Sequence, residues 1–153
     1  MAEQKNISWK IYWTDYTTGS YLYGSEITFH DKNHVEFENK LMPPGTVINS
    51  WYSRTNFQSQ KIEPSLPIID GEIKYKICAN IDTENASEIL IRLVYFDRYG
   101  EEIGNDVITG LIGEFQCPLR TYSYELQLIS GGVTRMDFHS IIIQEVPDED
   151  NSK

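Results

Sequence analysis

Apolar and polar residues alternate along much of the chain with the period of two that a half-buried β-strand requires. In EIKYKICANI one parity is apolar, namely Ile73, Tyr75, Ile77, Ala79 and Ile81, and the other parity holds Lys74 and Lys76. Because the apolar parity faces a core, this segment predicts an antiparallel strand with one solvated face.

Two further segments extend this pattern. TYSYELQLI alternates in the same way and places Tyr122, Tyr124, Leu126 and Leu128 inward. EILIRLVYF, from Glu88 to Phe96, is apolar at nearly every position, which predicts a central strand covered on both faces. The residues DRYG that follow predict a hairpin, with Gly100 at a positive φ and a return strand through Ile103.

The last apolar segment, VTRMDFHSIIIQEV, cannot keep one alternation throughout. Met136 and Phe138 share one parity, whereas Ile141 and Ile143 share the other. A single extra residue would restore the inward direction, so we expect a β-bulge near His139 or Ser140.

Together these segments predict an all-β protein. Strands are also expected at residues 8–13, 21–30, 35–38 and 46–54, which gives nine or ten strands at the spacing of roughly 8 to 12 residues typical of a sandwich. We therefore expect an antiparallel β-sandwich of the jelly-roll type over residues 1–146 of the 153-residue chain, followed by a short acidic, disordered tail at 147–153. The segment TNFQSQKIEPSLPIIDG predicts a long loop stiffened by prolines.

Charge and targeting signals narrow the function classes. The formal net charge of −10 disfavours binding to nucleic acid. The sequence MAEQKNISWK lacks the apolar run of a signal peptide, and no later segment predicts a transmembrane helix or a lipid anchor. The two cysteines, Cys78 and Cys117, need not pair, so we expect a cytoplasmic protein that meets the membrane only through partners.

Metal-site chemistry has little support in the sequence. His30 and His34 have a spacing that would share a face on a helix, but Asp31-Lys32-Asn33 between them predicts a hairpin turn. The third histidine, His139, is distant in sequence, and no cysteine lies near the pair. No metal and no cofactor is therefore proposed.

Catalytic chemistry is also weakly supported. Glu36 and Glu38 share a side of a strand, as the carboxylates of a jelly-roll glycosidase could, but a solvated strand face explains this pair fully. The chain has no G-x-S-x-G, P-loop or G-x-G-x-x-G motif. We therefore expect a protein that is not an enzyme.

Aromatic residues are abundant among the early strands. They include Trp9, Tyr12, Trp13, Tyr16, Tyr21, Tyr23, Trp51, Tyr52 and Phe57. Core packing accounts for most tryptophans in a sandwich, while tyrosines on an outer face would stack on sugar rings or anchor a protein interface. Tyr12, Tyr16, Tyr21, Tyr23 and Tyr52 are accordingly weak candidates for glycan or substrate contact.

Several blocks in the first half of the chain resemble a known family. They read YLYGS from Tyr21, FEN from Phe37, LMPPG from Leu41, then Trp51, TNFQ from Thr55 and PSLP from Pro64. In order and spacing they are similar to the smallest, third member of the Asp series of the accessory Sec system of Gram-positive bacteria.

That resemblance implies a fold like a carbohydrate-binding module and a non-catalytic role in protein export. It implies an adaptor that assembles with sibling Asp proteins and a SecA-type ATPase and helps to export serine-rich repeat glycoprotein adhesins. The alternative is a free-standing carbohydrate-binding module that recognises glycan through exposed aromatic residues.

The proline-rich corner LMPPG suggests where such an adaptor binds. Its prolines and glycine exclude a helix or a central strand, and a stiff corner has little conformational entropy to lose on binding. The candidate partner-binding residues are Met42, Pro43, Pro44, Trp51, Asn56, Phe57, Pro64 and Pro67. Trp51 would either support this surface from below or anchor the partner; alternatively, the prolines merely shape a loop.

Overall fold

The computed structural model describes residues 8–13, 20–21, 23–53, 66, 73–84 and 88–146. Within them the chain forms ten strands. These are β1 (Ser8–Ile11), β2 (Glu26–Asp31), β3 (His34–Glu38), β4 (Val47–Tyr52), β5 (Lys74–Asp82), β6 (Ile89–Phe96), β7 (Glu102–Thr109), β8 (Ile112–Gln116), β9 (Ser123–Ser130) and β10 (Arg135–Glu145). No helix in the described part is long and apolar enough to cross a membrane.

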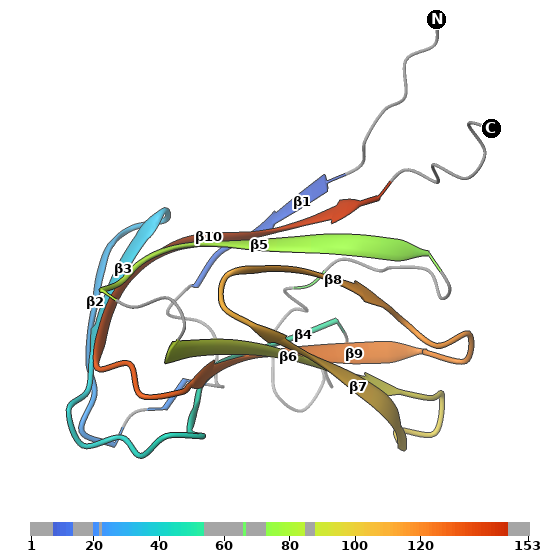
Figure 1. The fold of residues 1–153 in the computed structure, drawn as a ribbon, viewed down its shortest axis with the longest axis horizontal. Coiled ribbons are helices and arrows are strands. Elements are labelled where there is room, and N and C mark those ends of the chain that lie inside the picture. Colours follow the sequence, from blue (N-terminus) through green and yellow to red (C-terminus); the bar gives the residue numbers. More distant parts are fainter. Residues whose placement is uncertain are drawn as a thin grey trace, which may run out of the picture.

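The strands form two stacked antiparallel sheets (Figure 1). The six-stranded sheet has the order β2-β3-β10-β5-β8, with β1 also paired to β10, and the four-stranded sheet has the order β4-β9-β6-β7. The predicted all-β sandwich is therefore confirmed. Strand β6 lies between β9 and β7, so its predicted central position is correct, but it is not covered on both faces, because Leu90, Arg92 and Phe96 are only half-buried.

Strand β10 organises the larger sheet. Its first half, Arg135 to Phe138, pairs with β3, and its second half, Ile141 to Gln144, pairs with β1. The register with β5 shifts between Phe138 and Ser140, which confirms the predicted bulge. Because of this shift, apolar residues on both sides of the bulge point into the core.

The buried side chains of β5 and β9 follow the alternation of apolar and polar residues in the sequence, and one predicted inward residue is an exception. In β5 and β9 every second residue is buried. Tyr122 was expected to point inward but is 50% exposed. This prediction was wrong because β9 begins at Ser123, so Tyr122 belongs to the preceding turn and not to the alternating strand.

An aromatic cluster joins the two sheets. Trp51 of β4 stacks on Phe138 of β10 with ring centroids 5.6 Å apart, and Trp13 lies edge-on to both, at 6.3 Å from Trp51 and 5.5 Å from Phe138. Phe37 of β3 completes the cluster, 5.7 Å from Trp13. All four side chains are essentially inaccessible to solvent.

The main differences from the expectation are one strand that starts late and one strand that was not foreseen. The strand expected at residues 21–30 begins only at Glu26, because Gly24 has a φ of 76° and turns the chain before it. Strand β8 was not foreseen, because its glycine resembles a turn residue in the sequence. Gly113 of β8 is in fact a strand position paired with Ile77 of β5.

The predicted long loop, apart from Leu66, and the acidic tail lie outside the described residues. The single-domain boundaries therefore remain a prediction.

Gly113 lies at a close contact between the two sheets. A Cβ atom at this residue would lie 2.7 Å from Cγ2 and 2.9 Å from Cγ1 of Ile108. We expect Gly113→Ala to lower the free energy of unfolding by about 1–3 kcal/mol through overpacking. Gly104→Ala in β7 is the matched control, since its nearest neighbour would lie 3.7 Å away. Urea unfolding of both variants measures the effect, and equal stabilities would contradict this packing.

Candidate functional site

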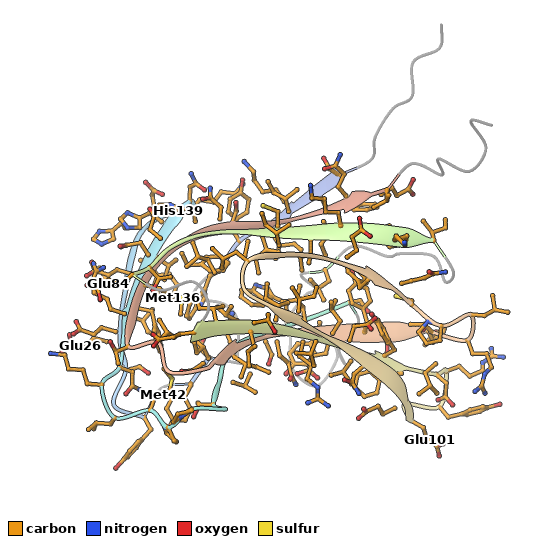
Figure 2. All side chains as sticks on the ribbon, in the orientation of Figure 1. Glu26, Met42, Glu84, Glu101, Met136 and His139 are labelled. Carbon is orange, nitrogen blue, oxygen red and sulfur yellow. The ribbon has the colours of Figure 1, made fainter. Side chains whose placement is uncertain are left out.

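The proline-rich corner and a neighbouring turn expose apolar side chains at one end of the sandwich. Tyr23 is 75% and Leu41 is 72% exposed, and Pro43 and Pro44 are also exposed. Met42 is half-buried and packs against the core (Figure 2). We call Tyr23, Leu41, Met42, Pro43 and Pro44 the corner surface.

A buried asparagine holds the two turns of the corner surface together. Asn39 is only 1% exposed, and its Nδ2 donates to the carbonyl of Tyr23 at 2.8 Å and to Oγ of Ser25 at 2.9 Å. Its Oδ1 accepts a hydrogen bond from the backbone N–H of Leu41 at 2.8 Å. One side chain therefore fixes the spacing between Tyr23 and Leu41.

The close approach of these turns also requires a glycine. A Cβ atom on Gly24 would lie 3.3 Å from Cδ1 of Leu41 and 3.5 Å from Oδ1 of Asn39, and its φ of 76° disfavours other residues. Gly24 is therefore part of the structural basis of the corner surface.

The other side of the corner is attached to the end of β9. Gly45 N–H donates to the carbonyl of Ser130 at 2.6 Å, and Ser130 N–H donates to the carbonyl of Thr46 at 2.8 Å. Within the turn, the carbonyl of Pro43 accepts hydrogen bonds from the backbone N–H and the hydroxyl of Thr46. The corner is thus preorganised, as the prolines suggested.

The structure separates the two roles considered for Trp51. Its side chain is 0% exposed, and its Nε1 donates to the carbonyl of Tyr12 at 2.9 Å. A partner cannot reach it in this conformation, so the supporting role fits and the anchoring role does not.

The remaining predicted site residues lie apart from the corner surface or outside the residues that the structure describes. Asn56, Phe57, Pro64, Pro67 and Tyr16 are outside the described residues. Tyr12, Tyr21 and Tyr52 are half-buried, and the ring of Tyr12 is covered by the ammonium of Lys32 at 4.7 Å. Of the tyrosines proposed for glycan contact, Tyr23 is therefore the well-exposed one within the described chain, and it belongs to the corner surface.

Sequence reasoning had not placed Leu41 in the site or joined Tyr23 to the prolines. The two turns are separated in sequence by β2 and β3, and the side-chain hydrogen bonds of Asn39 bring them together. The available signal in the sequence was an Asn, a residue common in turns, shortly before the two prolines.

A charged network covers the outer face of the larger sheet near its β2 end. Three imidazole rings form a row, with His30 and His34 4.4 Å apart and His34 and His139 5.1 Å apart. Each lies against a carboxylate; the partners are Glu36 for His30 at 3.1 Å, Asp137 for His34 at 2.9 Å and Asp82 for His139 at 3.2 Å. Arg135 joins Glu36 at 2.8 Å to Asp137 at 3.0 Å.

Four strands contribute to this network, which explains why sequence inspection missed it. The turn at Asp31-Lys32-Asn33 is confirmed as the β2–β3 hairpin, with Asn33 N–H donating to Asp31 Oδ1 at 2.7 Å. His139 reaches the row from β10. Among the described residues, however, no group of His, Cys, Asp and Glu is arranged to hold a metal ion.

The network lowers the pKa values of two of its carboxylates, Glu36 and Asp137. Hydrogen bonds from His30 and then Arg135 hold the pKa of Glu36 below its ordinary value, and hydrogen bonds from His34 and Arg135 do the same for Asp137. A glycosidase general acid needs the opposite shift. Glu36 is therefore a poor candidate for that role.

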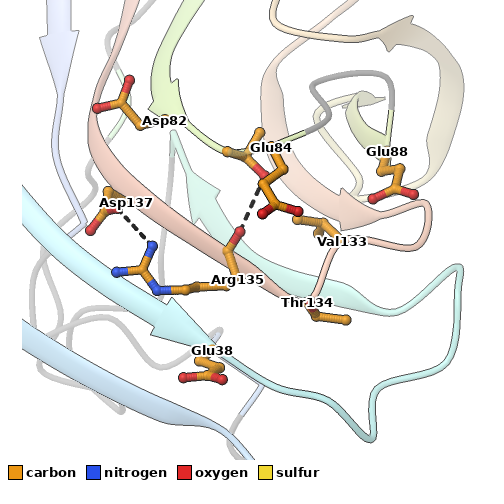
Figure 3. A pocket seen from close by; sticks show the side chains of 9 residues that line it. Glu38, Asp82, Glu84, Glu88, Val133, Thr134, Arg135 and Asp137 are labelled. Atoms are coloured by element: carbon orange, nitrogen blue, oxygen red, sulfur yellow. Dashed lines mark hydrogen bonds and ion pairs between the residues drawn. The ribbon is translucent and has the colours of Figure 1, made fainter.

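Next to the network lies an acidic groove of about 500 Å³ (Figure 3). Its lining comprises Glu38, Asp82, Thr83, Glu84, Glu88, Val133, Thr134, Arg135 and Asp137. Arg135 is the single cation among these residues, and it points toward Asp137. The groove would repel anionic ligands.

Both cysteines are free. Cys117 is 1% exposed, and burial followed by the nearby Asp106 raises its pKa to about 12. Its thiol therefore stays protonated and unreactive near neutral pH.

Comparisons with known proteins identify a matching family and similar relatives of this chain. Residues 20–145 match the family described as accessory Sec secretory system ASP3. The chain is 37% identical over 132 residues to the accessory Sec system protein ASP3 of Streptococcus gordonii, covering 86% of this chain and 83% of the relative.

Solved structures resemble the fold over most of the chain. The Glycosylation Associate Protein (Gap123) complex of Streptococcus agalactiae matches with a TM-score of 0.85 and 31% identity, over 93% of this chain but only 46% of the matched one. A structure of accessory secretory proteins 1, 2 and 3 of Streptococcus pneumoniae matches with a TM-score of 0.84 and 26% identity, over 96% and 100% of the two chains. A CBM22–xylanase structure from Clostridium thermocellum, at 15% identity and a TM-score of 0.53, shows a likeness of fold alone.

Asn39 is the residue on which the corner surface most depends. We expect Asn39→Ala to lower the free energy of unfolding by about 2 kcal/mol, because the side chain of Asn39 makes three hydrogen bonds that are lost. Hydrogen exchange at the Leu41 amide should accelerate as well. Asn105→Ala, at an exposed position of β7, is the control and should stay within about 0.5 kcal/mol of the parent. Unchanged exchange at the Leu41 amide would contradict the role of Asn39 in holding the two turns together.

His139 makes the stability of the sheet depend on pH. Its Nδ1 lies 2.8 Å from the Asn33 carbonyl and its Nε2 3.2 Å from Asp82, and only the imidazolium can donate to both acceptors. The hydrogen bond to Asn33, and then Asp82, raise the pKa of His139 above its ordinary value. The resulting stabilisation is full below the unfolded pKa of about 6.5 and is lost as the pH rises through the higher folded value.

We therefore expect His139→Gln to destabilise the protein by roughly 0.5 kcal/mol more at about pH 5.5 than at about pH 8.5. Chemical denaturation at both pH values measures the difference. A loss that is the same at both would show that His139 acts only through packing.

Proposed function

Given that the chain belongs to the ASP3 family and is thus a component of the accessory Sec secretory system, we propose that it serves as a non-catalytic adaptor that binds sibling Asp proteins through the corner surface. In this role it works in the cytoplasm with a SecA-type ATPase and helps to export serine-rich repeat glycoprotein adhesins. It meets the membrane only through these partners.

The observation that carries this proposal is the preorganised corner surface. Tyr23 and Leu41 remain largely exposed although Asn39 fixes the backbone beneath both. A rigid apolar surface loses little conformational entropy on binding, and tyrosine is enriched among residues that dominate interface energies. The matched Streptococcus pneumoniae structure contains accessory secretory proteins 1, 2 and 3 together, which supports partners of this kind.

The chemistry of the described residues favours a non-catalytic role. Glu36 and Asp137 of the charged network have lowered pKa values, and the buried thiol of Cys117 has a raised one. Near neutral pH the two carboxylates are therefore ionised and do not serve as general acids. The thiol is protonated and does not serve as a nucleophile.

A free-standing carbohydrate-binding module is the second candidate, on the strength of the fold and of exposed Tyr23. Glycan platforms use aromatic faces that are open to solvent, and Tyr12, Tyr21 and Tyr52 are half-buried. The described part of the chain therefore supports the adaptor better. Titration of glycans against tryptophan fluorescence would decide between the two.

The corner surface can be tested directly. We expect the double variant Tyr23→Ser, Leu41→Glu to weaken assembly with co-expressed sibling Asp proteins by about 2 kcal/mol or more, because both exposed apolar contacts are lost. Size-exclusion chromatography with light scattering measures the complex. Ile112→Ser, which removes a similarly exposed apolar residue from β8, should leave it intact. A stoichiometric complex with the double variant would exclude the corner surface as the interface.

A further inference from the structure

A second exposed apolar region lies at the opposite end of the sandwich. It is built by the β6–β7 hairpin and the β8–β9 connection, which lie at the right of Figure 1. Tyr99 is 81%, Leu119 69% and Tyr122 50% exposed. Together with the exposed Arg98 and Arg120 we call these residues the tip surface.

Local hydrogen bonds fix the hairpin half of the tip surface. Oδ1 of Asp97 accepts hydrogen bonds from the backbone N–H groups of Tyr99 at 2.9 Å and Glu101 at 3.0 Å. Gly100, with a φ of 82°, donates its N–H to the carbonyl of Asp97 at 3.0 Å. Tyr99 is therefore presented on a rigid turn.

The second loop is attached to the first. Tyr122 N–H donates to the carbonyl of Phe96 at 2.7 Å, and Thr121 N–H closes a turn onto the carbonyl of Pro118 at 3.1 Å. The Pro118 ring lies 3.7 Å from the position that a Cβ on Gly104 would take. The two loops thus form one continuous surface.

The charges of the tip surface differ from those of the rest of the protein. The chain carries a net charge of −10, yet Arg98 and Arg120 flank the exposed apolar residues. Neither arginine forms an ion pair with another residue in the described ranges.

Nearby carboxylates are mostly engaged elsewhere. Asp97 accepts the hydrogen bonds of the hairpin, and Glu102 lies 3.9 Å from Arg92. Two exposed guanidinium groups beside two tyrosines and a leucine have the composition of an interface centre, and they complement an acidic rim.

We propose that the tip surface is a second docking site, for a sibling Asp protein that presents an apolar pocket flanked by carboxylates. This proposal rests on the adaptor function and extends it. The corner surface is attached at Ser130 and the tip surface at Ser123, so they lie at the two ends of β9. At roughly 3.3 Å per residue these ends are about 23 Å apart, far enough for two partners to bind at once.

An anionic membrane is a less suitable occupant. Hydrogen bonds to Asp97 hold the hairpin in one conformation, which suits a shaped protein pocket better than a fluid lipid surface. Sedimentation with vesicles containing anionic lipid serves to detect this alternative.

The test measures the binding of each sibling Asp protein, separately and together, to the full chain at low and moderate salt. The tip variants are the double charge reversal Arg98→Glu, Arg120→Glu and the double truncation Tyr99→Ser, Leu119→Ser. Lys10→Glu, Lys76→Glu is the matched control, since it makes the same change in net charge at two exposed lysines of β1 and β5. Far-ultraviolet circular dichroism establishes that each variant is folded.

The expected result is that both tip variants weaken one sibling interaction at least tenfold, that the parent interaction weakens with salt, and that the lysine control matches the parent. The corner variant should affect a different interaction.

Parent-like binding of both tip variants overturns the tip proposal but leaves the adaptor function standing. A parent chain that binds no sibling overturns both, and vesicle binding that depends on Arg98 and Arg120 overturns the choice of a protein partner.

Discussion

The packing of Trp51 against Phe138 is the contact on which the arrangement of the two sheets depends. One ring belongs to β4 and the other to β10, and Trp13 closes the gap between them with an edge-on contact to each. Large aromatic groups bury more apolar area than any other side chain, and their fixed shapes define the distance between the sheets. The Trp51 indole also hydrogen-bonds the backbone after β1, so the same residue positions the first strand.

This aromatic cluster also supports the corner surface. Phe37 belongs to the cluster and lies two residues before Asn39, which ties the turns containing Tyr23 and Leu41 to each other. Strand β4 begins soon after the prolines and carries Trp51 into the core. Both ends of the exposed corner therefore continue into strands that contribute to the buried aromatic cluster, which restrains the corner.

Residue patterns in the sequence predicted most of the fold but little of the functional surfaces. The alternation in β5 and β9 and the change of parity in β10 are local features with a single sterically reasonable interpretation. Strand β8 and the exposure of Tyr122 were missed because turn-like glycines and strand ends depend on tertiary pairing. The pairing of Tyr23 with Leu41 and the approach of His139 to His34 join distant segments, and the pattern of one segment does not contain that information.

The surfaces at the two ends of β9 are consistent with the proposed adaptor role. One end presents an apolar corner, the other an apolar tip with two arginines, and a close-packed sandwich separates them. Hydrogen–deuterium exchange of the chain, free and in complex with its siblings, tests the corner most directly. The account predicts new protection at residues 23–25 and 41–46 on complex formation. A complex that leaves exchange in both segments unchanged would contradict it.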